Sequence, residues 1–360
     1  MIRLPRDHRF TADADPAVSA LLRVDLAAVA TRCEARAPRG TLLLGGSFAL
    51  GEGVAFLVEG RVVVLSDLDL FLVSPGGPLR ALALAARLRR DLMGAARARI
   101  DLTVLARGLA RMGLQGVGDL PVVAGAARGG AGGFDPSFPL HALHALQEEL
   151  LTPERDPLRR RYRINRCALA AVRALRALEE PSARGQRAAL AWLEAGGGRG
   201  LPARARALLR EAGAENLDLG LARGAGSEPG WPCWCAARDV LDALQARLGG
   251  GLGFADRLKA CQRLAWTVAR RGRAPRLVGG VHPRLVAVRS DLLHARGEAG
   301  ELDGGLLARA WRHLAALGLL AGPPPGDPES AWHQAVAAAR LDNPLRVVMG
   351  GEGPAAVCGR

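Results

Sequence analysis

Two aspartates interrupt an apolar run in the first third of the chain. Asp67 and Asp69 lie within residues 62–73, which read VVVLSDLDLFLV. Such a run is typical of a buried strand, in which side chains two residues apart point to the same face. Asp67 and Asp69 are therefore expected to project together, while Leu68 and Leu70 point to the opposite face, toward the core. Two neighbouring carboxylates in an apolar setting repel each other and lose hydration, and a divalent cation would remove that penalty.

A third aspartate lies in a similar setting further along the chain. Asp101 is flanked by Ile100 and Leu102 in the apolar stretch 98–105, which predicts another strand. A neighbouring position in one sheet would bring Asp101 beside the first pair. Three carboxylates supply the oxygen donors that suit Mg²⁺, which keeps several waters and shares its coordination shell with substrate phosphates.

A glycine-serine turn precedes the aspartates. Residues 41–44 (TLLL) predict a short buried strand that runs into Gly45, Gly46 and Ser47. The glycines allow the backbone to approach a phosphate closely, and N–H groups of the turn together with the Ser47 hydroxyl can donate hydrogen bonds to it. A nucleoside triphosphate would be held by this turn and by metal ions on the carboxylates.

The order of these features resembles the signature of the DNA polymerase β-like nucleotidyltransferase superfamily. That signature is a Gly-Ser turn after a helix and a strand, then an Asp-x-Asp strand, then a third aspartate on an adjacent strand. The resemblance covers residues 16–125 and rests on Gly46, Ser47, Asp67, Asp69 and Asp101. It implies transfer of a nucleoside monophosphate from an NTP donor to a hydroxyl acceptor, with release of pyrophosphate.

The resemblance also implies roles for the matched residues. Asp67 and Asp69 would bind two Mg²⁺ ions, for which Mn²⁺ can substitute. Asp101 would bind the catalytic ion and help to activate the acceptor. Gly46 and Ser47 would bind the nucleotide.

One stretch departs from the minimal members of the superfamily, in which a short loop joins the serine turn to the aspartates. The additional residues Glu52–Gly60 are expected to form a β-hairpin over the site. This departure leaves the identity of the NTP and of the acceptor open.

The expected fold class is α+β. A nucleotidyltransferase domain, residues 1–135, would hold a mixed sheet with flanking helices, and an all-α helical domain would follow in residues 136–360. The glycine-rich stretch 125–139, closed by prolines, marks the boundary. Helices are expected at 16–35 and 79–93 in the first domain. In the second they are expected at about 141–151, 157–180, 184–195, 201–213, 235–248, 254–271, 301–319 and 329–341.

The helix expected over residues 157–180 is amphipathic. Its apolar face comprises Ile164, Ala168, Ala171, Leu175 and Leu178, and its opposite face comprises Arg159, Arg163, Arg166 and Arg173. In one interpretation, Arg163 and Arg166 bind the triphosphate or an acidic acceptor. In the alternative interpretation, the arginines form the solvated face of the helix.

Charge and composition add little about the partner. The formal net charge is +14, yet Lys259 is the only lysine, and an arginine, alanine and glycine bias of this kind follows from GC-rich coding. Nucleic acid is therefore only weakly supported as a partner. Aromatic residues make up 4% of the chain, so a surface rich in base-stacking side chains is not evident. Cys233 and Cys235 are too closely spaced for a zinc knuckle.

No apolar run reaches the ~18 residues that a membrane span needs. The first residues also lack the apolar stretch of a secretory signal. A cytoplasmic protein with no membrane partner is the expectation.

Several functions are compatible with these sequence features. The leading hypothesis is a Mg²⁺-dependent nucleotidyltransferase whose acceptor is a small molecule, a sugar, a protein hydroxyl, a nucleotide or RNA. The alternatives are a synthase of cyclic or linear oligonucleotide second messengers and a non-catalytic, nucleotide-binding regulator.

Overall fold

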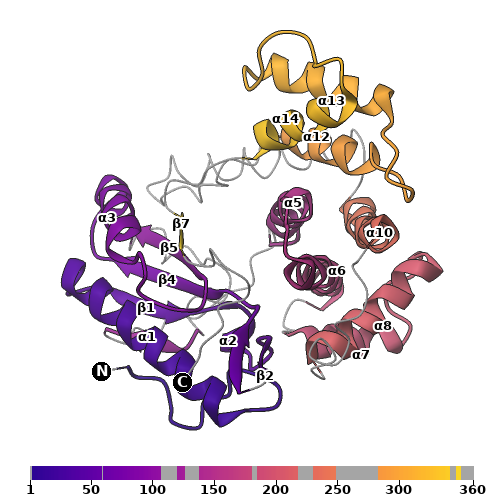
Figure 1. Cartoon of the computed structure of the whole chain (residues 1–360). Coiled ribbons are helices and arrows are strands. Elements are labelled where there is room, and N and C mark those ends of the chain that lie inside the picture. The colour runs from indigo at the N-terminus through magenta and orange to yellow at the C-terminus, as the bar shows by residue number, and fades with distance from the viewer. Residues whose placement is uncertain are drawn as a thin grey trace. The chain divides into compact units, whose positions relative to one another are not determined.

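The computed structural model describes residues 2–58, 60–106, 120–125, 138–180, 185–217, 230–248, 283–340 and 346–349. The chain is α+β and divides into two compact units (Figure 1). The first unit comprises Met1–Asp135, Ala214–Ala225 and Asp342–Arg360, and the second comprises Pro136–Gly213 and Gly226–Leu341.

The first unit is built on a mixed five-stranded sheet with the strand order β6-β1-β4-β5-β7. β4 and β5 are parallel, and the other neighbouring strands pair antiparallel. The strands are β1 (Thr41–Leu44), β4 (Leu68–Ser74), β5 (Ile100–Ala106), β6 (Val122–Ala124) and β7 (Arg346–Met349).

β7 corrects one expectation from the sequence. Residues 136–360 were expected to form only helices, yet β7 pairs with β5 at the edge of the sheet in the first unit. The edge strand β5 offers unpaired backbone groups, and the short apolar segment of β7 satisfies them.

The apolar run 62–73 was expected to form a single strand. Instead, residues 65–67 separate a strand that ends at Val64 from β4. β2 (Ala55–Val58) and β3 (Arg61–Val64) form a separate antiparallel hairpin, so the hairpin expected within Glu52–Gly60 is present but lies further along the chain, with its second strand after Gly60. The chain bends after β3 because the N–H groups of Leu65 and Ser66 both donate to the carbonyl of Val54, at 3.0 and 3.1 Å.

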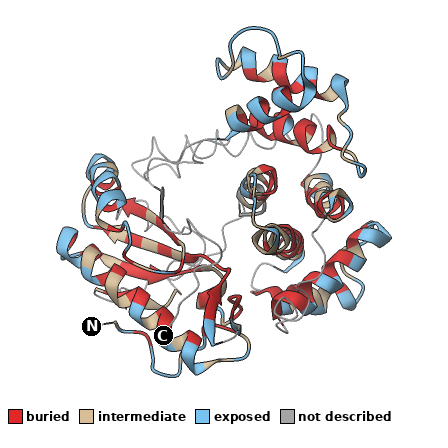
Figure 2. Cartoon of the chain, in the orientation of Figure 1, coloured by how far each residue is buried: buried red, intermediate tan, exposed pale blue. Residues whose placement is uncertain are grey.

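The helices of the first unit are α1 (Pro16–Arg36), the one-turn α2 (Gly46–Ala49) and α3 (Pro78–Asp91). α1 begins where the sequence predicts, since Oδ1 of Asp15 accepts hydrogen bonds from the N–H groups of Ala17 and Val18. Alternate residues of the sheet are buried against these helices (Figure 2). The core contains Leu22, Leu26, Leu42, Leu44, Leu68, Leu70, Leu72, Leu88, Ile100, Leu102 and Val104.

The second unit is helical. Its helices are α5 (Phe138–Leu151), α6 (Pro157–Glu179), α7 (Gln186–Glu194), α8 (Ala203–Leu217), α10 (Trp231–Arg247), α12 (Pro283–His294), α13 (Gly304–Ala316) and α14 (Pro328–Ala339). The end of α8, from Ala214 onward, is assigned to the first unit. α12 was not predicted, and the helix expected at 254–271 lies outside the described residues.

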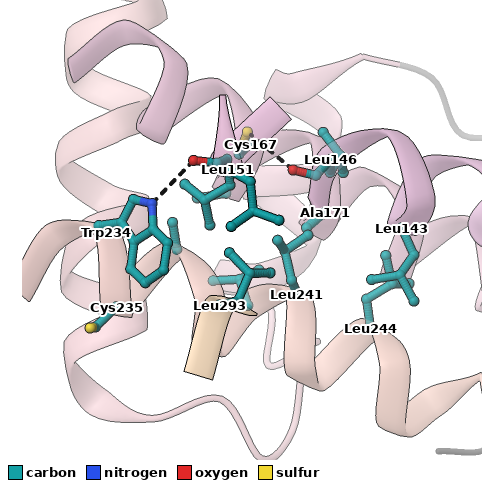
Figure 3. Packing of buried hydrophobic residues seen from close by; sticks show 14 of the residues in the cluster. Leu143, Leu146, Leu151, Cys167, Ala171, Trp234, Cys235, Leu241, Leu244 and Leu293 are labelled. Carbon is teal, nitrogen blue, oxygen red and sulfur yellow. Dashed lines mark hydrogen bonds between the residues drawn. The ribbon is translucent and has the colours of Figure 1, made fainter. Parts of the chain in front are cut away.

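α6 packs against α5, α7 and α10. Of its five predicted apolar-face residues, four are buried, and the prediction is wrong for Leu178, which is 37% exposed near the end of the helix. Figure 3 shows this core, in which the indole N–H of Trp234 donates to the carbonyl of Leu150 and the thiol of Cys167 donates to that of Leu146.

Candidate functional site

Asp69 and Asp101 lie opposite each other on neighbouring strands. β4 and β5 run parallel, and the register pairs Asp69 with Asp101 directly. Register partners share one face of a sheet, and neighbouring strands are about 4.8 Å apart. Leu68 and Ile100, which are also paired, lie on the core face. The sheet therefore brings two carboxylates together on the face turned away from α1 and α3, which confirms the expected adjacency.

Asp67 lies directly before β4 rather than inside it. Its carbonyl accepts a hydrogen bond from the N–H of Asp69 at 3.1 Å, while the next N–H, that of Leu68, donates to the carbonyl of Arg99 at 2.8 Å. Asp67 is buried, and its Oδ1 lies 3.8 Å from Nε of Arg99. Arg99 was not among the residues predicted for the site, although it stands two residues before Asp101, as Asp67 stands two before Asp69.

The glycine turn packs directly onto the Asp69 side chain. The N–H of Gly45 donates to the backbone carbonyl of Asp69 at 2.7 Å. Gly46 has a φ of +62°, and a Cβ atom built on it would lie 1.9 Å from Oδ2 of Asp69. Glycine is thus required at position 46 both for its backbone conformation and for the close approach of the carboxylate.

Ser47 is fixed by contacts with the residues that flank the hairpin. Its hydroxyl donates to Oγ of Ser66 at 3.2 Å, and Oγ of Ser66 also accepts from the N–H of Val54 at 2.8 Å. The carbonyl of Ser47 accepts from the N–H of Glu52 at 2.9 Å. These hydrogen bonds fix the position of Ser47, which directly follows Gly46, the residue that packs against Asp69.

Asp25 positions the start of β5, a role that was not predicted from the sequence. Oδ2 of this buried α1 residue accepts hydrogen bonds from the N–H groups of both Arg97 and Ala98, each at 2.9 Å. Burial raises the pKa of the Asp25 carboxyl, and these two hydrogen bonds oppose the shift. The signal in the sequence was a charged residue between Leu22 and Leu26 on the apolar face of a helix.

The donor set suits a hard divalent cation. Asp67, Asp69 and Asp101 offer carboxylate oxygens, which Mg²⁺ and Mn²⁺ prefer, and the register places two of the three side by side. The third, Asp67, is paired with Arg99. Within the part of the chain that the structure describes, no group of three or more His, Cys, Asp or Glu side chains is already arranged to hold a metal ion.

Arg163 and Arg166 belong to α6 of the helical unit. The Arg163 guanidinium donates to the carbonyls of Thr152 and Pro153, at 2.8 and 3.3 Å, and to the Glu154 carboxylate at 3.0 Å. Nη2 of Arg166 lies 3.6 Å from the carboxylate of Glu149. The Arg163 side chain is only 12% exposed, so it does not belong to a solvated face. These contacts tie α6 to the end of α5 and to the loop that follows.

Comparison of the chain with protein-family models, curated proteins and solved structures found no match. Among the described helices, none is both long and apolar enough to cross a membrane.

Proposed function

We propose that this chain is a metal-dependent nucleotidyltransferase with a polymerase β-like catalytic domain. It would transfer a nucleoside monophosphate from an NTP to a hydroxyl acceptor and release pyrophosphate. The observation that carries the proposal is the direct pairing of Asp69 with Asp101 across parallel strands, with the Gly46 backbone packed against the Asp69 carboxylate.

The topology around these residues supports the same proposal. The strand with Asp69 lies between β1, which leads into the Gly-Ser turn, and β5, which carries the third aspartate. A sheet in this order brings the Gly-Ser turn and the carboxylates of Asp69 and Asp101 close together, an arrangement that agrees with the superfamily signature.

Each residue has a distinct role in the proposed reaction. Asp67, Asp69 and Asp101 would hold two Mg²⁺ ions, which when bound polarise the phosphoryl oxygens and stabilise the charge of the leaving group. Backbone N–H groups of the turn at Gly46 and the Ser47 hydroxyl bind the triphosphate oxygens. The Asp101 carboxylate accepts the proton of the acceptor hydroxyl while the acceptor oxygen bonds to the α-phosphorus and the bond to pyrophosphate breaks.

The test is to incubate the purified chain with each labelled NTP and Mg²⁺ or Mn²⁺, and to separate the products by mass. Asp69→Asn and Asp101→Asn are the controls, because asparagine keeps the shape of the side chain and removes its charge. Label in the protein identifies a protein acceptor, a linear or cyclic oligonucleotide identifies a messenger synthase, and turnover only on addition of RNA identifies a tailing enzyme.

Two results would contradict the proposal. Nucleotide binding without turnover of any NTP, under all these conditions, would assign the chain to nucleotide-binding regulators. Turnover that survives in both asparagine variants would place the chemistry elsewhere in the chain.

A further inference from the structure

Four charged residues lie at the start of the two strands of the site, with Asp69 and Asp101 inside the strands and Asp67 and Arg99 directly before them. The register pairs Asp69 with Asp101, and it pairs Leu68 with Ile100 on the opposite face. Directly before the two strands, Asp67 and Arg99 are joined by an ion pair between their side chains. The two pairs together comprise three carboxylates and one guanidinium.

Arg99 places a positive charge beside the carboxylates. Its Nε is 3.8 Å from Oδ1 of Asp67, with the Asp67 side chain 9% exposed and that of Arg99 31% exposed. A guanidinium is charged at all physiological pH values, so it offsets the repulsion among the carboxylates when no metal ion is bound. A divalent cation at Asp67 would meet this positive charge and would have to compete with it.

The backbone of Arg99 is held on both sides, whereas its side chain reaches solvent. Its carbonyl accepts the N–H of Leu68, and the two preceding N–H groups, of Arg97 and Ala98, are held by Asp25. The guanidinium can therefore change partner without a change in the strand. Its planar set of donors matches a phosphate as well as a carboxylate.

We propose that Arg99 is a resident counterion of the carboxylate site, which a divalent cation displaces from Asp67 and which then binds a phosphate oxygen of the incoming triphosphate. This inference rests on the proposed function and adds how the binding of metal ion and triphosphate would be regulated. Metal and triphosphate bind cooperatively. The metal ion displaces the Arg99 guanidinium from Asp67 and makes it available to the phosphate, and the bound phosphate in turn leaves Asp67 available to the metal ion. Free metal ions alone bind weakly.

The experiment compares Arg99→Gln with Arg97→Gln in the full chain. Arg97 is exposed and lies two residues earlier, so its replacement makes the same change in net charge. Mn²⁺ binding is measured by electron paramagnetic resonance without nucleotide, and binding of magnesium tripolyphosphate is measured by calorimetry. Tripolyphosphate is used because it presents the phosphates without a choice of base.

Arg99→Gln is expected to bind Mn²⁺ about fivefold more tightly than the wild type, the effect of removing one partly exposed charge pair. The same variant should bind magnesium tripolyphosphate about tenfold more weakly, because a charge-assisted hydrogen bond is lost. Arg97→Gln should leave both affinities unchanged. Arg99→Lys, which keeps the charge, should retain wild-type Mn²⁺ affinity and serves if the glutamine variant does not fold.

The outcomes separate this inference from the proposed function. If Asp69→Asn abolishes Mn²⁺ binding while Arg99→Gln binds both ligands as the wild type does, the counterion role is overturned and the metal site stands. If Mn²⁺ binds to neither the wild type nor Arg99→Gln, the metal site itself is overturned, and the counterion role with it.

Discussion

Gly46 lies so close to Asp69 that a single added methyl group would overlap the carboxylate. A Cβ atom at this position would lie 1.9 Å from Oδ2 and 2.7 Å from Cγ of Asp69. The φ of +62° at Gly46 adds a second constraint, since residues other than glycine are strained in this region. The turn and the carboxylate therefore depend on each other for their positions.

Gly46→Ala is expected to abolish NTP turnover and to weaken Mn²⁺ binding, because Asp69 must move away from Asp101. The matched control is Gly60→Ala. Gly60 has a similar φ of +75°, yet no atom of the described residues lies within 4 Å of its Cβ position. The control should lose only about 1 kcal/mol of stability from backbone strain and keep its activity. Equal turnover in the two variants, measured on folded protein, would show that the contact at Asp69 has no role in the reaction.

Ser47 and Ser66 share a hydrogen bond but are expected to respond differently to alanine substitution. Ser47→Ala should weaken triphosphate binding by about 1.5–3 kcal/mol, the contribution of a hydrogen bond to a charged group, and leave Mn²⁺ binding in place. Ser66→Ala removes the acceptor for the buried N–H of Val54. It should reduce the free energy of unfolding by about 1–3 kcal/mol.

Calorimetry with a triphosphate and urea unfolding, applied to both serine variants, provide the check. A loss of triphosphate affinity in Ser66→Ala but not in Ser47→Ala would transfer the phosphate-binding role from Ser47 to Ser66.

The buried carboxyl of Asp25 is expected to make the free energy of unfolding depend on pH. Because burial raises its pKa in the folded state, the unfolded chain loses this proton first as the pH rises. The stability contribution of Asp25 is therefore greatest below the ordinary aspartate pKa, and it falls as the pH rises through the raised value. Asp25→Asn removes the fall and keeps both hydrogen bonds, since a single oxygen of Asp25, Oδ2, accepts them.

Urea unfolding between pH 3 and pH 8 checks this prediction. The stability of Asp25→Asn relative to the wild type should increase with pH. Asp25→Ala should be less stable than Asp25→Asn at every pH, by roughly 2 kcal/mol, because two N–H groups lose their acceptor. A difference between the asparagine variant and the wild type that does not change with pH would contradict the raised pKa.

The strand pattern was sufficient to predict how Asp69 and Asp101 meet, but it wrongly placed Asp67 in the same strand as Asp69. Alternation placed Asp69 and Leu70 on opposite faces, and an apolar setting for Asp101 predicted its neighbouring strand; both hold because side-chain direction in a strand follows from the backbone alone. The bend at Ser66 was not predictable in the same way. It depends on hydrogen bonds to Val54, a residue on the other side of the hairpin, while the apolar pattern continues through it.

The sequence pattern also did not identify which residues far apart in the chain contact each other. The helical period placed Arg163 on a face of α6 but contained no information about Thr152 or Glu154, which belong to the segment that precedes the helix. The segment of β7 is apolar enough for a strand, yet its pairing with β5 joins parts of the chain that are far apart in sequence. Arg99 was overlooked because an arginine next to a strand is common, and only the three-dimensional structure shows that its side chain lies beside that of Asp67.

The arginines of α6 allow the two interpretations of that helix to be tested. Arg163→Gln removes donors to the carbonyls of Thr152 and Pro153 and to the Glu154 carboxylate. We expect the free energy of unfolding to fall by about 1–3 kcal/mol, with the KM for NTP unchanged. Arg166→Gln should cost less than about 1 kcal/mol, because its separation from Glu149 is typical of a weak, partly exposed ion pair.

Arg155→Gln is the control for the arginine variants, since Arg155 is exposed in the segment between α5 and α6. Denaturant unfolding and NTP kinetics are measured on all three variants. A rise in KM for Arg163→Gln or Arg166→Gln, with stability equal to that of Arg155→Gln, would support the nucleotide-binding role predicted from the sequence. A loss of stability in Arg163→Gln at constant KM would instead assign this guanidinium to the packing of α6 against the end of α5.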